Sequence, residues 1–362
     1  MIRQTGNRNL RKLNTFGTDA VARLFVEYSA PSDLAALNWA ALPQPVRSIG
    51  EGSNMLFTGD FQGTLLHSGV KGIEVDRERS AGDDVFVTVG AGEKMDDFCR
   101  WAAGKGLWGP ENLSGIPGTA GASAVQNVGA YGVEAGDIID SVACFDTVEK
   151  KFVTLSSGEC AFAYRDSFFK HTAGRYIVTA VTFLLHTDFR PRLEYGALRE
   201  QVERNVELFS PSANPYESLF SAGQPSSMLP LTPMLVRETV LVIREEKLPD
   251  IRKTGSAGSF FKNPVVGGEK FGEVKRLAGG AEVPHYDLPD GGVKIPAAWL
   301  IDSCGLKGCR RGGAGVWDRQ PLVIVNADGR ATASDILSLE KHITDTVRDR
   351  YGITLEPEVE HI

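Results

Sequence analysis

The sequence has little of what several classes of protein require. Among 362 residues there are only five cysteines, an odd number scattered along the chain, which indicates reduced thiols rather than a disulfide framework. Acidic residues outnumber basic ones, 46 to 39, so the net charge is −7 and the basic face of a general nucleic-acid binder is missing. No apolar run is long enough to span a bilayer, and the first residues lack the apolar segment of a signal peptide. These absences predict a cytoplasmic protein that binds neither nucleic acid nor membrane.

A metal or redox centre built on cysteine also has little support. Cys304 and Cys309 are spaced more widely than a Cys-x-x-Cys pair, and no second Cys/His pair lies near them. Structural thiols are therefore the favoured interpretation, and no metal site is predicted.

With 362 residues, the chain exceeds the length at which a single hydrophobic core stops growing. Two or three domains are therefore expected. The most informative stretch of the chain is residues 114–132, where five glycines stand among Ala, Ser and Thr without any charged side chain. Glycine tolerates positive φ, so successive backbone N–H groups can point into one concavity that accepts a flat or phosphate-bearing cofactor. Residues 50–54 offer a second such turn after a strand, although neither run is a dinucleotide-binding fingerprint. A tightly packed structural loop is the alternative for the glycine-rich run.

The residue pattern predicts a mixture of helices and strands. Helices are expected at 18–28 after a cap at Thr18, at 32–37, at 96–107, and after a cap at Ser334. From 206 to 232, Ser, Pro, Asn and Gly interrupt any period, which predicts an irregular loop. Pro357 favours an extended tail over 355–359. The expected strands are 45–49, 55–57, 85–89, 141–145, 151–155, 176–185, 240–244 and 322–325.

Three separated side chains are candidates for chemistry. Arg165 follows Tyr164 beside an aromatic cluster, and its guanidinium offers two parallel donors to a carboxylate, although it could equally pair with a neighbour at a domain edge. Ser259 follows a glycine and precedes two phenylalanines, where it is either a turn cap or a proton donor in a dry pocket. No histidine is near Ser259 in sequence, so a Ser–His hydrolase is not supported. Glu358 is either a solvated carboxylate near the chain end or a buried acid.

Two cations, Arg244 and Lys247, lie close together further along the chain. They suit a diphosphate ligand and would be equally at home on the surface.

Seven separated segments occur in a characteristic order: residues 14–16, 50–57, 109–132, 164–170, 247–250, 255–265 and 355–359. Together they resemble the UDP-N-acetylenolpyruvoylglucosamine reductase family. These flavoenzymes complete UDP-N-acetylmuramate for bacterial peptidoglycan. The sequence Tyr195-Gly-Ala-Leu after Arg192 resembles the subtype whose loop carries a substrate-closing tyrosine. The resemblance covers nearly the whole chain.

The resemblance implies an α+β fold, with an FAD-binding module of two subdomains of the vanillyl-alcohol-oxidase type and a C-terminal α+β substrate domain. The implied divisions are 1–74 joined by the tail 353–362, then 75–248 with a substrate loop near 190–232, then 249–352. FAD would be bound non-covalently and NADPH would be the co-substrate of a monomeric enzyme. The implied FAD-binding residues are Gly50, Glu51, Gly52, Ser53, Asn54, Ile116, Pro117, Gly118, Thr119, Gly121, Ser123, Gln126 and Asn127.

The resemblance also implies a reaction in two halves. NADPH reduces the flavin and leaves, and the hydride then passes from flavin N5 to the enolpyruvyl group of the UDP-sugar. Arg165 and Glu358 match the positions that polarise the substrate carboxylate, and Ser259 matches the proton donor. Glu358 could donate a hydrogen bond only if burial kept it protonated. The positions that hold or close over the substrate are matched by Tyr164, Tyr195, Arg244, Lys247 and Asn263.

Two departures accompany the match. Relatives often have a basic residue at position 360, where this chain has Glu360, and the segment 206–232 is longer than expected. Two other functions stay open: an alcohol oxidase of the same flavin fold, and a flavin-binding protein without turnover. The oxidase would need a His or Cys placed to attach flavin covalently, and the flavin-lining motifs contain none.

Overall fold

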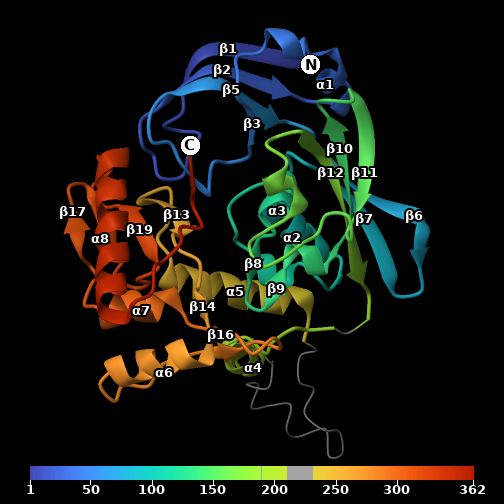
Figure 1. Cartoon of the computed structure of the whole chain (residues 1–362). Helices are drawn as coiled ribbons and strands as arrows, with labels where there is room; N and C mark the ends of the chain where they lie inside the picture. The colour runs from blue at the N-terminus through green and yellow to red at the C-terminus, as the bar shows by residue number, and fades with distance from the viewer. Residues whose placement is uncertain (189, 210–230) are drawn as a thin grey trace, which may run out of the picture.

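A four-stranded sheet, a five-stranded sheet and a second four-stranded sheet organise the chain, with helices between and outside them (Figure 1). The computed structural model describes residues 1–188, 190–209 and 231–362. None of the helices in these ranges combines the length and the apolar surface that a membrane span requires.

The N-terminal sheet has the strand order β1-β2-β5-β3, in which β1 pairs antiparallel with β2 and the other pairs are parallel. Helix α1 (Pro31–Ala36) covers one end, where a short helix was predicted. The helix predicted at 18–28 is wrong, because residues 21–28 form the second strand, paired on both sides. The spacing of the apolar residues in this segment is compatible with a helix and with a strand. Pairing with strands on both sides outweighs the local helical pattern. The four strands are β1 (Ile2–Asn9), β2 (Val21–Tyr28), β3 (Val46–Ile49) and β5 (Phe61–Ser68).

The second sheet is antiparallel throughout, in the order β11-β10-β12-β7-β6. Helices α2 (Met95–Gly104) and α3 (Ala120–Gln126) pack on it, and Phe98 of α2 stacks on Phe183 at 4.5 Å between ring centroids. Its strands confirm the predicted hairpin and the two neighbouring strands. They are β6 (Ile73–Ala81), β7 (Asp84–Gly90), β10 (Ile139–Asp146), β11 (Lys151–Ser156) and β12 (Tyr176–His186). The hairpin of β8 (Gly129–Ala130) and β9 (Val133–Glu134) contacts the short helix at Glu111–Leu113.

Two helices correct the predictions for the middle of the chain. Helix α4 (Leu198–Phe209) contradicts the irregular loop predicted at 206–209, and residues 210–230 of that prediction lie outside the described residues. Helix α5 (Pro233–Lys247) replaces the strand expected at 240–244. Thr232 caps α5, and buried residues at helical spacing, Val236, Val240 and Ile243, pack against α4 and α2. β-branched residues made this segment look like a strand, but capping and tertiary packing determine a helix.

The C-terminal sheet has the order β13-β19-β18-β17 and packs against helices α7 and α8. Thr332, rather than the predicted Ser334, caps α8, because Thr332 and Asp335 form a reciprocal capping box. The elements are β13 (Gly255–Ser259), β17 (Arg310–Arg311), β18 (Ala314–Val316), β19 (Val323–Asn326), α7 (Ala297–Ser303) and α8 (Ala333–Tyr351). A small sheet of β14 (Val265–Val266), β15 (Tyr286–Asp287) and β16 (Val293–Lys294) lies near α6 (Gly268–Leu277).

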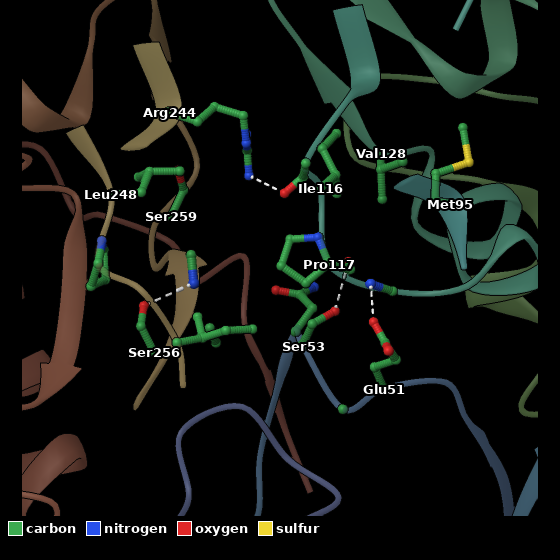
Figure 2. A pocket seen from close by; sticks show the side chains of 18 of the residues that line it. Glu51, Ser53, Met95, Ile116, Pro117, Val128, Arg244, Leu248, Ser256 and Ser259 are labelled. Atoms are coloured by element: carbon green, nitrogen blue, oxygen red, sulfur yellow. Dashed lines mark hydrogen bonds between the residues drawn. The ribbon is translucent and has the colours of Figure 1, made fainter. Parts of the chain in front are cut away.

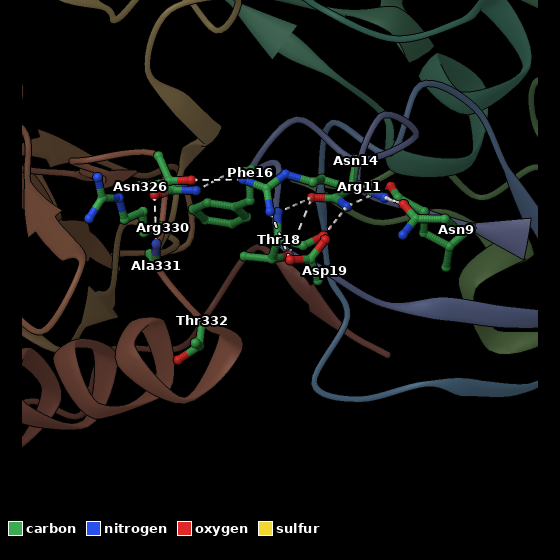
Figure 3. Close-up of polar contacts among 12 residues, drawn as sticks. Asn9, Arg11, Asn14, Phe16, Thr18, Asp19, Asn326, Arg330, Ala331 and Thr332 are labelled. Carbon is green, nitrogen blue, oxygen red and sulfur yellow. Dashed lines mark hydrogen bonds and ion pairs between the residues drawn. The ribbon is translucent and has the colours of Figure 1, made fainter.

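Both ends of the chain tie the C-terminal part to the N-terminal sheet. Asn326 Nδ2 donates to Phe16 O at 3.0 Å, and Asn14 binds Thr18 in the same connection (Figure 3). At the other end, β20 (Glu360–His361) pairs in parallel with β4 (Met55–Leu56). The tail therefore returns to the loop at residues 50–54, which is one wall of the site.

Candidate active site

A cavity of about 800 Å³ lies where residues 50–54, the glycine-rich run, α5 and β13 meet (Figure 2). This volume is within the range typical of cofactor pockets. The predicted residues that line it are Gly50, Glu51, Gly52, Ser53, Asn54, Ile116, Pro117, Gly118, Thr119, Ser123, Gln126, Arg165, Arg244, Ser259 and Glu358. The structure thus brings most of the implied flavin residues and all three candidate catalytic residues to one cavity.

The loop at 50–54 is bound tightly to the glycine-rich run. Glu51 Oε2 accepts a hydrogen bond from Gly118 N at 2.8 Å, and Ser53 Oγ donates to Pro117 O at 3.0 Å. Gly52 has φ +61°, and a Cβ there would lie 2.2 Å from Leu13 O. The two glycine-containing turns therefore form one continuous wall without bulky side chains.

Gly115 is fixed from both sides by charged groups, the predicted Arg244 and Asp96, which the sequence did not reveal. Its N–H donates to Asp96 Oδ1 at 2.7 Å, and its carbonyl accepts from Arg244 Nη2 at 2.9 Å. Arg237, whose side chain is 4% exposed, holds the same Asp96 carboxylate with both terminal nitrogens. Neither Asp96 nor Arg237 carries a local signal, because their contact joins α2 to a helix of which only residues 240–244 were assigned, as a strand.

Arg244 extends from α5 toward the chain at Ile116 (Figure 2). Burial lowers the pKa of its guanidinium, an effect that the neighbouring Tyr131 hydroxyl partly offsets. An arginine stays charged despite such a shift, so Arg244 provides a fixed cation on the cavity wall.

Arg165 and Glu358 form an ion pair within the cavity. Arg165 Nε lies 2.8 Å from Glu358 Oε1, and the two side chains are 19% and 17% exposed. Arg165 also donates from Nη2 to Gly129 O at 2.7 Å and has an uncommon positive φ of +55°. Burial raises the pKa of Glu358, while Arg165 and Lys170 partly oppose that shift.

The C-terminal tail places Glu358 beside the end of β13. Glu358 N donates to Phe260 O at 2.8 Å, and Asn54 Nδ2 donates to Glu358 O at 3.1 Å. Ser259 is the last residue of β13 and lines the cavity after Gly258, whose φ is +74°. Among the described residues, no hydrogen bond involves the Ser259 hydroxyl. That hydroxyl is therefore free to meet a ligand.

Two predicted flavin residues lie behind the cavity rather than on its surface. Gly121 packs on Ala91, where an added Cβ would come within 2.8 Å of the alanine Cβ. Asn127 is buried with φ +45°, and its Nδ2 donates to Glu134 Oε2 and Ala163 O. Both residues shape the wall through packing and backbone support.

Lys247 and Asn263 also lie outside the cavity lining. Lys247 is exposed, and its carbonyl accepts a hydrogen bond from Trp317 Nε1 at 3.1 Å. Asn263 Oδ1 accepts from Ala297 N at 2.9 Å and so supports the start of α7. Their predicted contact with substrate stays a prediction.

Tyr164 and Tyr195 lie in an aromatic cluster next to Arg165. Tyr195 stacks on Tyr286 at 6.3 Å, and burial, with Tyr286 beside it, raises the pKa of Tyr195 to about 12. The ammonium of Lys294 lies 4.8 Å from the ring centre of Tyr164, and the Arg165 guanidinium lies 5.4 Å from it. Tyr286 and Lys294 were missed, because a single Tyr and a single Lys in a polar segment carry no distinctive pattern.

The lining fits a non-covalently held flavin. The cradle from Gly115 to Thr119 is uncharged, and neither His nor Cys is among the described residues that line the cavity. Cationic and acidic groups stand elsewhere on its surface, on α5, on the segment 250–253 that follows it, and at Arg165 and Glu358. An uncharged cradle with charged groups around it suits a flat, partly apolar ligand that carries a phosphate-bearing chain.

Comparisons with known proteins agree with this arrangement. Residues 25–151 match the family described as "FAD binding domain", and residues 250–362 match "UDP-N-acetylenolpyruvoylglucosamine reductase, C-terminal domain". The crystal structure of UDP-N-acetylenolpyruvylglucosamine reductase from Thermus caldophilus is similar, with a TM-score of 0.63 and 23% identity. It covers 100% of this chain and 98% of its own. The expected α+β fold, with an FAD-binding module followed by a C-terminal domain, is confirmed.

Relatives in sequence extend over almost the whole chain. The UDP-N-acetylenolpyruvoylglucosamine reductase of Bacteroides fragilis strain YCH46 is 41% identical over 351 residues, 96% of this chain and 97% of its own. The reductase of Neisseria gonorrhoeae is 44% identical over 356 residues, 97% of this chain and 95% of its own. The chain belongs to the UDP-N-acetylenolpyruvoylglucosamine reductase family.

Proposed function

We propose that this protein reduces UDP-N-acetylglucosamine enolpyruvate to UDP-N-acetylmuramate, with bound FAD and with NADPH as hydride donor. Family membership over almost the entire chain supports this reaction, a step of peptidoglycan precursor synthesis. The observation that carries the proposal is the meeting of Arg165, Ser259 and Glu358 on the cavity that also contains the uncharged cradle. We further propose that the enzyme works in the cytoplasm as a monomer.

FAD, when bound, accepts a hydride from NADPH and supplies it to the substrate. Residues 50–54 and 116–119 would hold it, together with Ser123 and Gln126. Gly50 permits this arrangement, since a Cβ there would lie 3.1 Å from Thr119 Oγ1 and 3.2 Å from Ala122 Cβ. Gly121 and Asn127 would support the cradle from behind.

Arg165 and Glu358 would bind the carboxylate of the enolpyruvyl group. When hydride adds to the terminal methylene carbon, the electron pair of the double bond moves to the neighbouring carbon and spreads into that carboxylate. Donors that are already oriented stabilise this charge at little cost in reorganisation. Arg165 is oriented by Gly129 O and Glu358, and Glu358 in its protonated form could donate a second hydrogen bond.

Ser259 would donate the proton that completes the reduction. The new C–H bond forms on the carbon beside the carboxylate as the Ser259 O–H bond breaks, so hydride and proton together saturate the double bond. A serine hydroxyl is a weak acid, but its target is strongly basic and the cavity holds cations to stabilise the alkoxide until solvent reprotonates it. Its hydroxyl has no competing hydrogen bond among the described residues.

The remaining predicted residues would recognise the sugar nucleotide. Arg244 is a cation on the cavity wall, and Tyr164 and Tyr195 belong to the aromatic cluster beside Arg165. Lys247 and Asn263 would have to approach the diphosphate from outside the present lining. We retain the division into 1–74 with 353–362, 75–248 with its substrate loop near 190–232, and 249–352 as part of this proposal.

The proposal is tested by the product. Purified protein loaded with FAD, with NADPH and the enolpyruvyl sugar nucleotide, should yield a compound two hydrogens heavier, identified by mass spectrometry as UDP-N-acetylmuramate. Absence of this product from FAD-loaded protein would contradict the proposal. Oxidation of an alcohol, with oxygen or another acceptor consumed, would instead favour an oxidase of the same flavin fold.

A further inference from the structure

The tail residue Glu360 lies directly behind the cavity wall. It belongs to β20, and its N–H donates to Asn54 O at 3.0 Å, so its backbone is fixed to the loop at 50–54. Its side chain is 27% exposed, and Oε2 lies 4.0 Å from Arg47 Nη1. Glu360 is thus held in place by the backbone and by one cation.

The carboxylate of Glu360 binds the amide of Gln126. Gln126 Nε2 donates to Glu360 Oε1 at 2.6 Å, a short, charge-assisted hydrogen bond. At the other end of the amide, Gln126 Oε1 accepts from Asn54 Nδ2 at 3.2 Å and from Lys170 Nζ at 3.1 Å. Two donors on one end and an acceptor on the other leave a single satisfied orientation of this amide.

This network reaches the candidate catalytic arginine. Lys170 Nζ, besides binding Gln126, donates to Arg165 O at 3.1 Å, at the position where Arg165 has its positive φ. Gln126 itself lines the cavity. A change at Glu360 is therefore expected to alter the cavity wall through Gln126 and to disturb the support of Arg165 through Lys170.

We propose that Glu360 is a positioning residue that fixes the Gln126 amide for the bound cofactor. The inference rests on the proposed FAD site. Many relatives have a basic residue at position 360, whereas in this chain the acceptor Glu360 sets the orientation of the amide. A donor at this position would face the Gln126 N–H group and favour a turned-over amide. The turned amide would then point its N–H group at Lys170 and Asn54, which are also donors.

The test compares variants of the full-length protein by FAD binding. Glu360→Gln keeps an acceptor, so its dissociation constant for FAD should stay within about 3-fold of wild type. Glu360→Arg replaces the acceptor with a donor, and losing a hydrogen bond to a charged group corresponds to about 10- to 100-fold weaker binding. Its bound flavin should also show a shifted visible absorption spectrum.

A charge reversal elsewhere in the tail and a compensating double variant serve as controls. Glu356→Arg makes the same change in charge at an exposed residue and should leave FAD binding and the spectrum unchanged. In the double variant Glu360→Arg, Gln126→Glu, a donor at position 360 again faces an acceptor at position 126. This variant should recover at least part of the lost affinity for FAD. Thermal unfolding of each apoprotein separates loss of fold from loss of positioning.

The outcomes distinguish this inference from the function on which it rests. Wild-type affinity and spectrum in Glu360→Arg, or no recovery in the double variant, would overturn the positioning role and leave the FAD site standing. Failure of the wild-type protein to bind FAD would overturn the proposed function itself.

Discussion

Arg165 Nε and Glu358 Oε1 lie 2.8 Å apart in an ion pair that joins the central part of the chain to its C-terminal tail across the cavity. Each partner is also tied to another segment, Arg165 through Gly129 O and Glu358 through Phe260 O and Asn54. A substrate carboxylate entering here would meet a donor whose orientation is already fixed. The pair is therefore the most informative place to change the protein.

Arg165→Lys should slow reoxidation of the reduced enzyme by the sugar nucleotide by about 10²- to 10³-fold, the usual cost of removing one oriented donor. A lysine ammonium is a point charge and cannot bind Gly129 O, Glu358 and a carboxylate with the planar geometry of a guanidinium. Stopped-flow absorbance measures this half-reaction separately from reduction by NADPH, which should change little. Arg100→Lys on the exposed surface of α2 is the matched control, and equal rates in both variants would argue against the carboxylate role.

Ser259→Ala should leave reduction by NADPH nearly normal and lower the rate of substrate reduction by about 10²- to 10⁴-fold, the range for general acid catalysis. Ser256→Ala removes a hydroxyl from the same strand, where it accepts a hydrogen bond from Gly258 N, and should have a much smaller effect. If both half-reactions slowed equally in Ser259→Ala, the serine would not be the proton donor.

Glu358→Gln should change how stability depends on pH. Burial raises the pKa of Glu358 above its ordinary value of 4.5, so the unfolded chain ionises more readily than the folded protein. The wild type should therefore lose stability relative to Glu358→Gln as pH rises from about 4.5 through the raised pKa. Urea unfolding of both proteins between about pH 4 and pH 8 measures the difference. A difference that is constant, or that favours the wild type at higher pH, contradicts the raised pKa.

Asp96→Ala should destabilise the protein by about 3–5 kcal/mol, because it leaves the buried Arg237 guanidinium without its partner. The double variant Asp96→Ala, Arg237→Met should recover part of this loss, since it removes the unpaired charge. Urea unfolding gives both values. A double variant that is no more stable than Asp96→Ala would show that the ion pair is not the source of the effect.

Gly52→Ala should impair both folding and FAD binding, because the added Cβ would lie 2.2 Å from Leu13 O at a φ of +61°. Gly59→Ala in the following loop meets nothing within 4 Å and is the control. Thermal unfolding and FAD titration of the two variants should separate them clearly. Similar behaviour of the two variants would contradict the close packing inferred at Gly52.

The periodicity of apolar residues predicted those helices and strands whose formation depends mainly on their own sequence. The strand at Val85–Val89 and the helix that begins at Met95 follow their periodicity, and both lie where the pattern puts them. Residues 21–28 and 240–244 were assigned wrongly, because both carry β-branched and apolar residues at spacings compatible with helix and strand alike. Pairing with β5 settles the first and packing against α2 and α4 settles the second.

The residues of the candidate site also fall into two groups, those that the sequence revealed and those that only the fold brings together. Arg165, Ser259 and Glu358 stand in motifs whose order could be recognised, and they line one cavity. Asp96, Arg237 and Lys294 could not be found, because their importance arises only from contacts across the fold.

The most direct test of the account is a two-step anaerobic absorbance measurement on the FAD-loaded protein. NADPH should bleach the flavin band, and the enolpyruvyl sugar nucleotide, added after NADPH is exhausted, should restore it with formation of one equivalent of product. A flavin that NADPH bleaches and that stays bleached when this nucleotide is added would contradict the proposed function.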